Sequence, residues 1–324
     1  PKDGVSPVQE RQMVTQEGEN VDVRAVIGNF DDAQAGVKRI FSDEAVRAEL
    51  DKRGYFLSSA NSINWGRLVP QIVYYFAAYA QLLKAGQIAL GDAVDFCVPT
   101  GNFGDILAGY YAKQMGLPVG KLVCASNENN VLTDFLTTGT YTARRAFYKT
   151  TSPSMDILVS SNLERLLYHV TGSDTEVASL MKQLNETGSY TVRPETLAAI
   201  QESFACGWSS EAQVAEEIRA RYEQDHYLCD THTAVAFHVA AQHKRDGVPM
   251  VVLSTASPFK FPRSVLEALG HTAPANDFEA MQQLEEATGC TAPASLSALR
   301  QKAERFHTVI DPEQIAQVAL RYQA

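Results

Sequence analysis

Residues 94–104 read VDFCVPTGNFG, and this stretch decides the fold. Its first five residues are mostly apolar, which is typical of a strand that is buried on both faces. A glycine loop follows at 101–104, and a helical pattern then continues to about Gly116. A strand that leads through a short loop into a helix is the repeating unit of parallel α/β sheets. The sequence therefore predicts an α/β fold in which a parallel sheet carries helices on both faces.

Three further strand and helix pairs are expected along the chain. They are a strand at 20–27 with a helix at 31–52, a strand at 55–58 with a helix at 68–84, and a strand at 121–125 with a helix at 129–136. Residues 161–245 change to helical patterns separated by glycine and proline, and a strand returns at 250–254 before three short helices. We expect residues 1–58 to be part of a small α/β domain and 59–324 to form a large domain with a helical insertion at about 161–245.

Composition excludes several classes of partner and compartment. The formal net charge of −10 comes from 28 basic and 38 acidic residues, without a basic stripe, so nucleic acid is not expected. The apolar runs are shorter than the ~20 residues that span a bilayer, so no membrane contact is expected. Five cysteines without a CxxC pair indicate reduced thiols and a cytoplasmic protein. The first residues carry no signal pattern, and we expect the chain to begin within a domain.

The glycine loop at 101–104 has the layout of an anion site. Backbone N–H groups converge there, and the start of a helix adds about half a positive charge. An ordinary turn with glycines for close packing is the alternative, and the spacing alone does not decide between them. The loop lacks the GxGxxG pattern of dinucleotide sites. Residues 28–31 have a similar layout, but Asp31 and Asp32 would cap their own helix and repel a phosphate, so we favour the later loop.

A second polar loop and two later residues could also take part. Residues 61–67 read NSINWGR and offer amide, hydroxyl and guanidinium donors to a second oxyanion, although a polar loop that caps a helix would look the same. Thr255 follows a strand and could place its hydroxyl at the edge where open α/β folds bind ligands. Lys260 could be an amine nucleophile, but a lysine with a packed stem and a solvated ammonium is the commoner case.

No metal or hydrolase site is expected. Asp230, His232, His238 and His243 lie close together in sequence, but His232 and His238 fall on different faces of a helix and no HExxH pattern occurs. No GxSxG elbow or other pairing of nucleophile and base appears either.

Five segments, in the same order along the chain, resemble threonine synthase. They are Val5–Met13, Phe30–Gln34, Ser59–Asn64, Pro99–Asp105 and Thr255–Pro262. The resemblance implies a fold-type II pyridoxal-phosphate enzyme, related in architecture to the tryptophan synthase β chain. It would convert O-phosphohomoserine and water into threonine and phosphate, in the last step of threonine biosynthesis.

The resemblance also implies roles for individual residues. Gly101, Asn102, Phe103 and Gly104 match the loop that cradles the phosphate of the cofactor, pyridoxal 5'-phosphate, and Thr255 matches the hydroxyl placed against its pyridine nitrogen. Asn61, Ser62 and Arg67 match the loop that holds the substrate phosphate. Lys260 matches a lysine beside that site, which is not the lysine of the Schiff base.

The Schiff-base lysine of the family stands in a Phe-Lys-Asp context, and no lysine of this chain does. We therefore expect the catalytic residues to lie before Pro1, and the chain by itself to be inactive. One alternative is a non-catalytic relative that keeps the phosphate-binding loops. Another is a different fold-type II lyase with the same loops. Monomer and homodimer both remain open.

Overall fold

The structure, a computed structural model, describes residues 1–2, 5–28 and 30–322, and they form two compact units. One unit comprises residues 1–59 with 273–324, and the other comprises residues 60–272. The sequence led us to expect 59–324 in one domain, whereas the structure groups its last part with the start of the chain. No described helix combines the length and apolarity needed to cross a bilayer.

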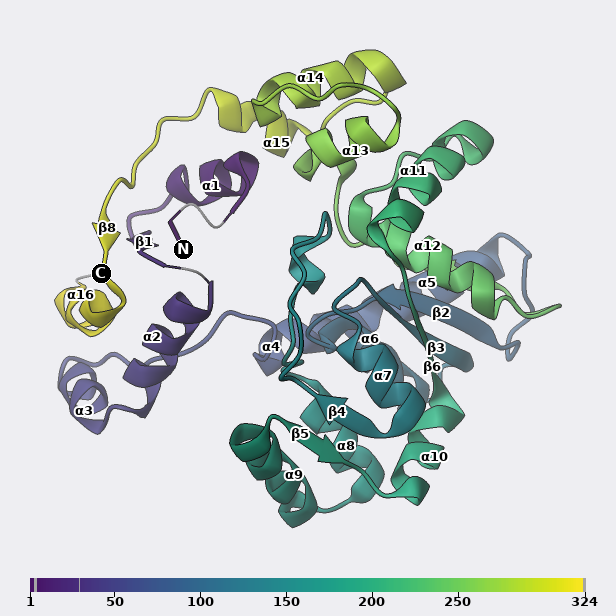
Figure 1. The fold of residues 1–324 in the computed structure, drawn as a ribbon, viewed down its shortest axis with the longest axis horizontal. Coiled ribbons are helices and arrows are strands. Elements are labelled where there is room, and N and C mark those ends of the chain that lie inside the picture. Colours follow the sequence, from purple (N-terminus) through teal and green to yellow (C-terminus); the bar gives the residue numbers. More distant parts are fainter. Residues whose placement is uncertain (3–4, 29, 323–324) are drawn as a thin grey trace. The chain divides into compact units, whose positions relative to one another are not determined.

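A four-stranded parallel sheet forms the centre of the unit at 60–272 (Figure 1). Its order is β6-β3-β2-β7, with β2 at Val94–Pro99, β3 at Val119–Ser126, β6 at Phe204–Trp208 and β7 at Met250–Val252. In the register of the ladder, Cys97 of β2 lies beside Val123 and Val252. All strands therefore end at one edge, here called the carboxyl edge, and begin at the opposite one, the amino edge. This arrangement confirms the α/β prediction.

Helices cover both faces of β2, as predicted. Consecutive side chains of a strand point to opposite faces, and here Phe96 and Cys97 are both fully buried. The Phe96 ring lies 5.0 Å from Tyr75 of α5 (Ile72–Lys84). The Cys97 thiol donates a hydrogen bond of 3.2 Å to Ala236 O of α12 (Thr231–His243). α5 and α12 thus lie on opposite faces of the sheet.

The stretch 161–245, expected to be helical, also contains β5 and β6. The prediction missed β6 because its five residues include Gly207, which looked like a break between helices. In the structure, a Cβ at Gly207 would lie 2.8 Å from Val239 Cγ1, so the glycine allows α12 to approach the strand. The other elements of this unit are α4 (Trp65–Leu68), η1 (Val69–Gln71), α6 (Gly104–Gln114), α7 (Val131–Thr138), β4 (Thr140–Thr142), η2 (Pro153–Met155), α8 (Leu163–Thr171), α9 (Asp174–Thr187), β5 (Ser189–Thr191), α10 (Pro194–Ser203), α11 (Glu211–Asp225), η3 (Pro258–Lys260) and α13 (Pro262–Ala268).

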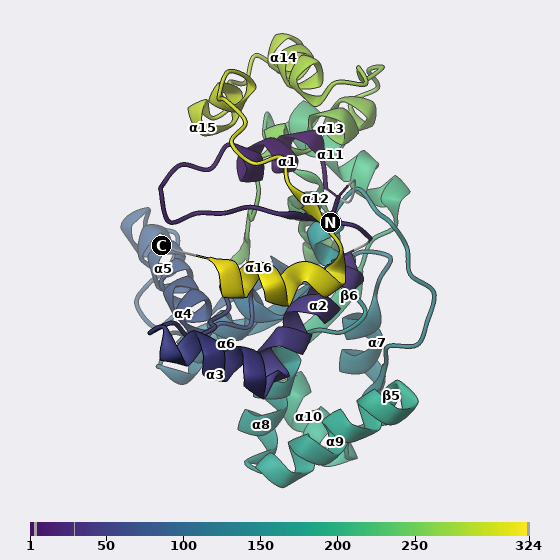
Figure 2. The same cartoon turned by 90° about the vertical axis from the view of Figure 1, so that its left-hand side faces the viewer.

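The unit formed by both ends of the chain is held by a small parallel ladder and a helical cluster. β1 (Ala25–Val26) pairs with β8 (Val309–Ile310), and both are labelled in Figure 1. α16 (Ile315–Arg321) contacts α2 (Phe30–Ser42) and α3 (Glu44–Lys52), as Figure 2 shows. These contacts explain why residues 273–324 group with the first 59. The remaining elements are α1 (Pro7–Val14), α14 (Asp277–Thr288), α15 (Ala294–Ser297), η4 (Ala298–Arg300) and η5 (Pro312–Gln314).

Two expectations for this unit were wrong. The single helix expected at 31–52 is broken at Asp43, whose carboxylate accepts a hydrogen bond of 2.9 Å from Ala45 N and caps α3. The strand expected at 55–58 does not form, and Tyr55 and Leu57 instead pack against the buried cluster of α2 and α3. Asn29 and the side chains of Phe30 and Asp31, which belong to the earlier glycine loop, lie outside the described residues.

Candidate functional site

The glycine loop lies at the carboxyl edge, between β2 and α6. Thr100 N donates 2.8 Å to Ala125 O, which ties the start of the loop to the neighbouring strand. Phe103, the residue before α6, has φ of 62° and ψ of 12°, in the left-handed region. Its ring is buried 5.5 Å from the ring of Phe204, and this packing offsets the backbone cost of that conformation. No side chain in the described part of the chain caps α6, so its first N–H groups can meet an anion.

Gly101 lies so close to the backbone of η2 that a residue with a side chain would not fit at this position. A Cβ at this position would lie 3.0 Å from Ser154 O and 3.1 Å from Met155 Cα. Both atoms belong to the backbone of η2, which forms the floor beneath the loop and cannot move aside as a side chain could. The glycine is therefore needed for a close approach of two backbones.

Three consecutive polar residues hold the glycine loop. Ser160 Oγ donates 2.8 Å to Gly101 O, and Ser161 Oγ lies 3.1 Å from Asn102 Oδ1. Asn162 Nδ2 donates 2.9 Å to Asn102 O and 3.1 Å to Ser62 O. Asn162 thus bonds both the glycine loop and the loop at 61–64, which brings together two of the segments that the sequence analysis proposed.

The loop at 61–67 organises itself by side-chain caps. Asn61 Oδ1 accepts 3.1 Å from Ile63 N, and Asn64 Oδ1 accepts 2.7 Å from Gly66 N and caps α4. The exposed Arg67 donates 2.8 Å to Ala60 O through Nη1. The loop therefore caps a helix, as the alternative interpretation predicted. The guanidinium group of Arg67 lies at the surface of the unit that also contains the glycine loop.

Thr255 and Lys260 lie beyond the end of β7, the strand next to β2. They are thus on the carboxyl edge, where open parallel sheets bind ligands. Thr255 is exposed, and Lys260 is half-buried at the end of η3, with Nζ 5.9 Å from the centre of the Phe261 ring. Among the described residues, no hydrogen bond or ring contact joins either residue to the glycine loop, so their roles stay predictions.

Sequence reasoning missed the residues that support these loops. Asn127, directly after β3, donates from Nδ2 to Ser152 Oγ at 3.0 Å and to Asp156 Oδ1 at 2.8 Å, and so holds the segment that contains η2. Asn162 was missed in the same way. The available signal was an uncharged polar residue just after a strand or just before a helix, where side chains bond backbone groups.

Asp105 places a carboxyl group in the first turn of α6. Burial raises the pKa of this carboxyl to about 6, although a hydrogen bond of 3.2 Å from the Tyr75 hydroxyl opposes the shift. Burial and the Asp105 charge raise the pKa of Tyr75 well above its ordinary value, so the tyrosine remains a donor. The charge next to the glycine loop therefore changes within a pH range accessible to experiment.

The described part of the chain contains no group of three or more His, Cys, Asp and Glu side chains able to hold a metal ion. All five cysteines are free thiols, and burial raises the pKa of Cys97 and Cys124. Buried thiols of this kind are poor nucleophiles.

Comparison with known proteins gives the context of this site. Residues 233–319 match the family described as "Threonine synthase, C-terminal". Human threonine synthase-like 1 is 43% identical over 272 residues, which cover 83% of this chain and 37% of that protein. Threonine synthase of Schizosaccharomyces pombe is 40% identical over 301 residues, which cover 85% of this chain and 57% of that protein.

Solved structures give the same result. The PLP-bound threonine synthase of Brucella melitensis superposes with a TM-score of 0.83 at 41% identity, over 98% of this chain and 64% of that one. The yeast enzyme gives a TM-score of 0.80 at 33% identity, over 97% and 61%. The chain therefore spans about two fifths to two thirds of the relatives that it matches.

Proposed function

We propose that this chain, which is homologous to the C-terminal part of threonine synthases, forms the phosphate-binding part of such an enzyme. The enzyme would use pyridoxal 5'-phosphate to convert O-phosphohomoserine and water into L-threonine and phosphate. The observation that carries the proposal is the double hydrogen bond of Asn162, which joins the two loops expected to hold the two phosphates.

The groups around the glycine loop fit a cofactor phosphate. The N–H groups at the start of α6 and the backbone of Gly101 to Gly104 would hold it, because the N-terminus of an 11-residue helix favours an anion. The partners of the loop, Ser160, Ser161 and Asn162, are uncharged and so do not compete with the ligand for charge. When bound, the cofactor supplies an electron sink for carbanionic charge.

Thr255 would face the pyridine nitrogen, where a neutral hydroxyl leaves the ring nitrogen without a proton. At the other loop, Asn61, Ser62 and Arg67 would bind the phosphate of the substrate, with Lys260 adding a second positive charge. A guanidinium group matches the geometry of a phosphate. These roles are binding roles, and the residue that forms a bond with the cofactor is not assigned to this chain.

The binding test uses the purified chain and three probes. We expect pyridoxal 5'-phosphate to bind saturably in a fluorescence titration, inorganic phosphate to compete with it, and pyridoxal to bind at least about tenfold more weakly. Equal binding of pyridoxal would contradict the phosphate role of the glycine loop. Because no lysine lies in the Phe-Lys-Asp context, borohydride should leave no ligand attached. Covalent attachment that survives denaturation would overturn the restriction to binding roles.

The substrate is tested by product release from the protein as it occurs naturally. We expect phosphate release from O-phosphohomoserine and no release of acetate from O-acetylhomoserine. The opposite preference would favour a different lyase that has the same loops.

A second candidate is a relative that binds phosphate ligands without turnover. It is supported by the 43% identity to threonine synthase-like 1 proteins, a match as high as that to any of the synthases described above. Saturable binding of pyridoxal 5'-phosphate and of O-phosphohomoserine, without formation of threonine, would favour this candidate. A cytoplasmic location, for which the five free thiols speak, and a monomeric or homodimeric state complete the proposal.

A further inference from the structure

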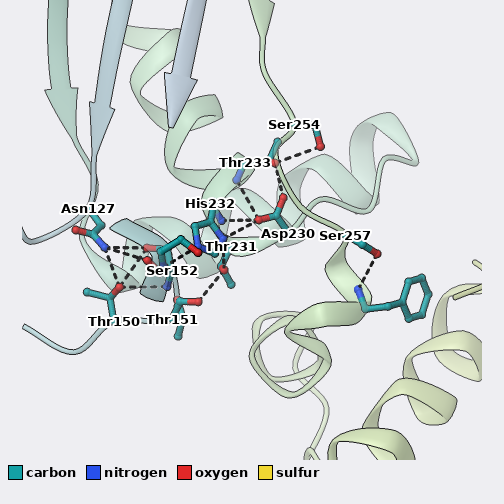
Figure 3. Close-up of polar contacts among 12 residues, drawn as sticks. Asn127, Thr150, Thr151, Ser152, Asp230, Thr231, His232, Thr233, Ser254 and Ser257 are labelled. Carbon is teal, nitrogen blue, oxygen red and sulfur yellow. Dashed lines mark hydrogen bonds and ion pairs between the residues drawn. The ribbon is translucent and has the colours of Figure 1, made fainter. Parts of the chain in front are cut away.

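A buried hydrogen-bond network centred on Asp230 connects the segment 151–154 with Ser254, which lies beyond the end of β7 (Figure 3). Asp230 is fully buried and caps α12 by accepting 2.9 Å from His232 N. The same carboxylate also receives His232 Nδ1 at 2.9 Å and the Thr233 hydroxyl. A buried carboxylate needs such donors, and the start of the helix adds to its stabilisation. The network is therefore organised around one buried carboxyl group.

The first arm of the network runs from Asp230 to the glycine loop. His232 is 3% exposed, and its Nε2 lies 3.2 Å from Ser154 N. Since Ser154 N–H can only donate and the carboxylate can only accept, one state of the ring satisfies both contacts, the neutral form with its proton on Nδ1. Ser154 O is the atom that a Cβ at Gly101 would approach to 3.0 Å. His232 thus holds the residue on which Gly101 rests.

A neighbouring contact strengthens this arm. Thr231 Oγ1 donates 2.7 Å to Thr151 O, so the first turn of α12 bonds two backbone groups of the segment 151–154. Asn127 bonds Ser152 of the same segment from the end of β3. The floor beneath the glycine loop is therefore held in place by side chains from two other elements of the same unit.

The second arm runs from Asp230 to the end of β7. Thr233 donates to Asp230 and lies 3.3 Å from Ser254 Oγ, within hydrogen-bond distance. Ser254 directly precedes Thr255, the residue proposed to face the pyridine nitrogen. The two arms end at the two places where a cofactor would be held, one at its phosphate and the other at its ring.

We propose that Asp230, His232 and Thr233 are positioning residues that set the glycine loop and Thr255 relative to one another. This inference rests on the proposed function for the identity of the ligand, but the coupling between the two segments does not depend on it. None of the three residues touches the ligand, and each acts through Ser154 or Ser254. The two arms act on different parts of the site: His232 positions the glycine loop, which would hold the phosphate of the cofactor, and Thr233 positions Thr255, which would face its ring.

Two replacements at position 232 dissect the first arm. In His232→Asn the side-chain amide can still donate to Asp230, because it matches Nδ1, but nothing accepts from Ser154 N. In His232→Gln the amide oxygen reaches the position of Nε2 and accepts from Ser154 N. His238→Asn is the matched control, since it makes the same change six residues further along α12. Thr233→Val removes the hydroxyl of the second arm and keeps the shape of the side chain.

The first measurement is amide hydrogen exchange of the chain without ligand. We expect His232→Asn to speed exchange at 101–104 and at Ser154 by about tenfold and to leave 253–257 unchanged. Thr233→Val should do the reverse, and His232→Gln should restore the protection of the loop. Equal acceleration of both segments in both variants would mean a general loosening of α12 and would overturn the proposal. No acceleration in either variant would overturn it as well.

The second measurement is ligand affinity. We expect His232→Asn to weaken pyridoxal 5'-phosphate about tenfold and pyridoxal hardly at all, whereas Thr233→Val weakens both ligands alike. If both variants weakened pyridoxal 5'-phosphate and pyridoxal in the same ratio, the division into two arms would be wrong. If the unchanged chain binds neither ligand, the proposed function fails, and the exchange data alone decide whether the coupling exists.

Discussion

The amino and carboxyl edges of the four-stranded sheet are built on opposite electrostatic plans. At the amino edge, Asp95 is 1% exposed and receives both Nε and Nη2 of Arg245, at 2.7 and 2.6 Å, together with Lys121 N at 2.6 Å. At the carboxyl edge, the glycine loop is bonded by uncharged residues, and its helix start has no side-chain cap. The amino edge pairs its charges internally, whereas the proposed site at the carboxyl edge would use its free N–H groups to bind an anion.

The glycines show the same difference. A Cβ at Gly120 would lie 2.3 Å from Asp95 Oδ1 and 2.6 Å from Arg245 Nη2, so this glycine makes room for an ion pair of the protein itself. A Cβ at Gly101 would meet backbone beside a loop that offers N–H groups. Glycine thus makes room for an ion pair at the amino edge, and at the carboxyl edge it makes room for two backbone segments of the proposed binding site.

The largest effect is expected from Arg245→Met at the amino edge. It leaves the Asp95 carboxylate buried without its ion-pair partner, so the free energy of unfolding at neutral pH should fall by about 3 kcal/mol. This is the low end of the range of about 3 to 5 kcal/mol for breaking a buried ion pair, because Arg245 is 46% exposed. Urea unfolding of the variant and the parent measures this change in the free energy of unfolding. Adding Asp95→Asn should recover more than half of the loss. A single variant that costs under about 0.5 kcal/mol would show that the amino edge does not depend on its ion pair.

The next largest effect contrasts the same substitution at both edges. Gly101→Ala should weaken pyridoxal 5'-phosphate about 30-fold, or about 2 kcal/mol, because the added methyl group displaces either η2 or the loop. Gly120→Ala should lower the free energy of unfolding by about 1 to 3 kcal/mol and leave affinity unchanged. Titration and urea unfolding of both variants separate the two roles. If Gly120→Ala also weakened the ligand, the edges would not be independent.

Asp105 allows a pH test of the carboxyl edge. Because burial raises the pKa of this carboxyl from 3.8 to about 6, the folded state holds the proton more tightly than the unfolded state does. Stability should therefore fall as the pH rises from about 4 to about 6. Asp105→Asn removes this loss, so the variant should be more stable than the parent at pH 8 by about 1 to 2 kcal/mol, and by less at pH 4. Thermal midpoints at both pH values would show a constant gap if the assignment were mistaken.

The smallest effect is expected at Thr255. This residue is exposed, so Thr255→Ala should change the free energy of unfolding by less than about 0.5 kcal/mol. The lost hydroxyl should weaken pyridoxal 5'-phosphate about threefold, while competition by inorganic phosphate stays the same. Thr255→Ser should retain parent affinity. An unchanged affinity in the alanine variant would remove Thr255 from the proposed site.

The sequence predicted the centre of the unit at 60–272 well. β2 and β3 were expected at 94–98 and 121–125 and occur at Val94–Pro99 and Val119–Ser126, because continuous apolar runs bounded by glycine or polar residues have few other conformations. β6 could not be recognised, since a short edge strand with Gly207 gains its stability from β3 and α12 rather than from its own pattern.

The proposed site was predictable as separate loops but not as an assembly. The sequence shows that 61–67 and 101–104 are polar or glycine-rich, but the hydrogen bonds of Asn162 to both depend on folding across 60 and 100 residues. His232 was visible only as one histidine among several. Its contacts to Asp230 and Ser154 are a local cap and a bond across 78 residues, and only the first could be read from spacing.

The strand order has a consequence for synthesis of the chain. β2 and β3 are complete once residue 126 has been made, whereas their outer neighbours end at residues 208 and 252. A chain that emerges from the ribosome can thus pair the central strands early, but both edges of that pair wait for later residues. Until residue 232 emerges, Ser154 lacks its histidine, so the loop that would hold phosphate is made before this part of its support. A nascent chain that ends between residues 126 and 252 would therefore expose strand edges to which a chaperone could bind.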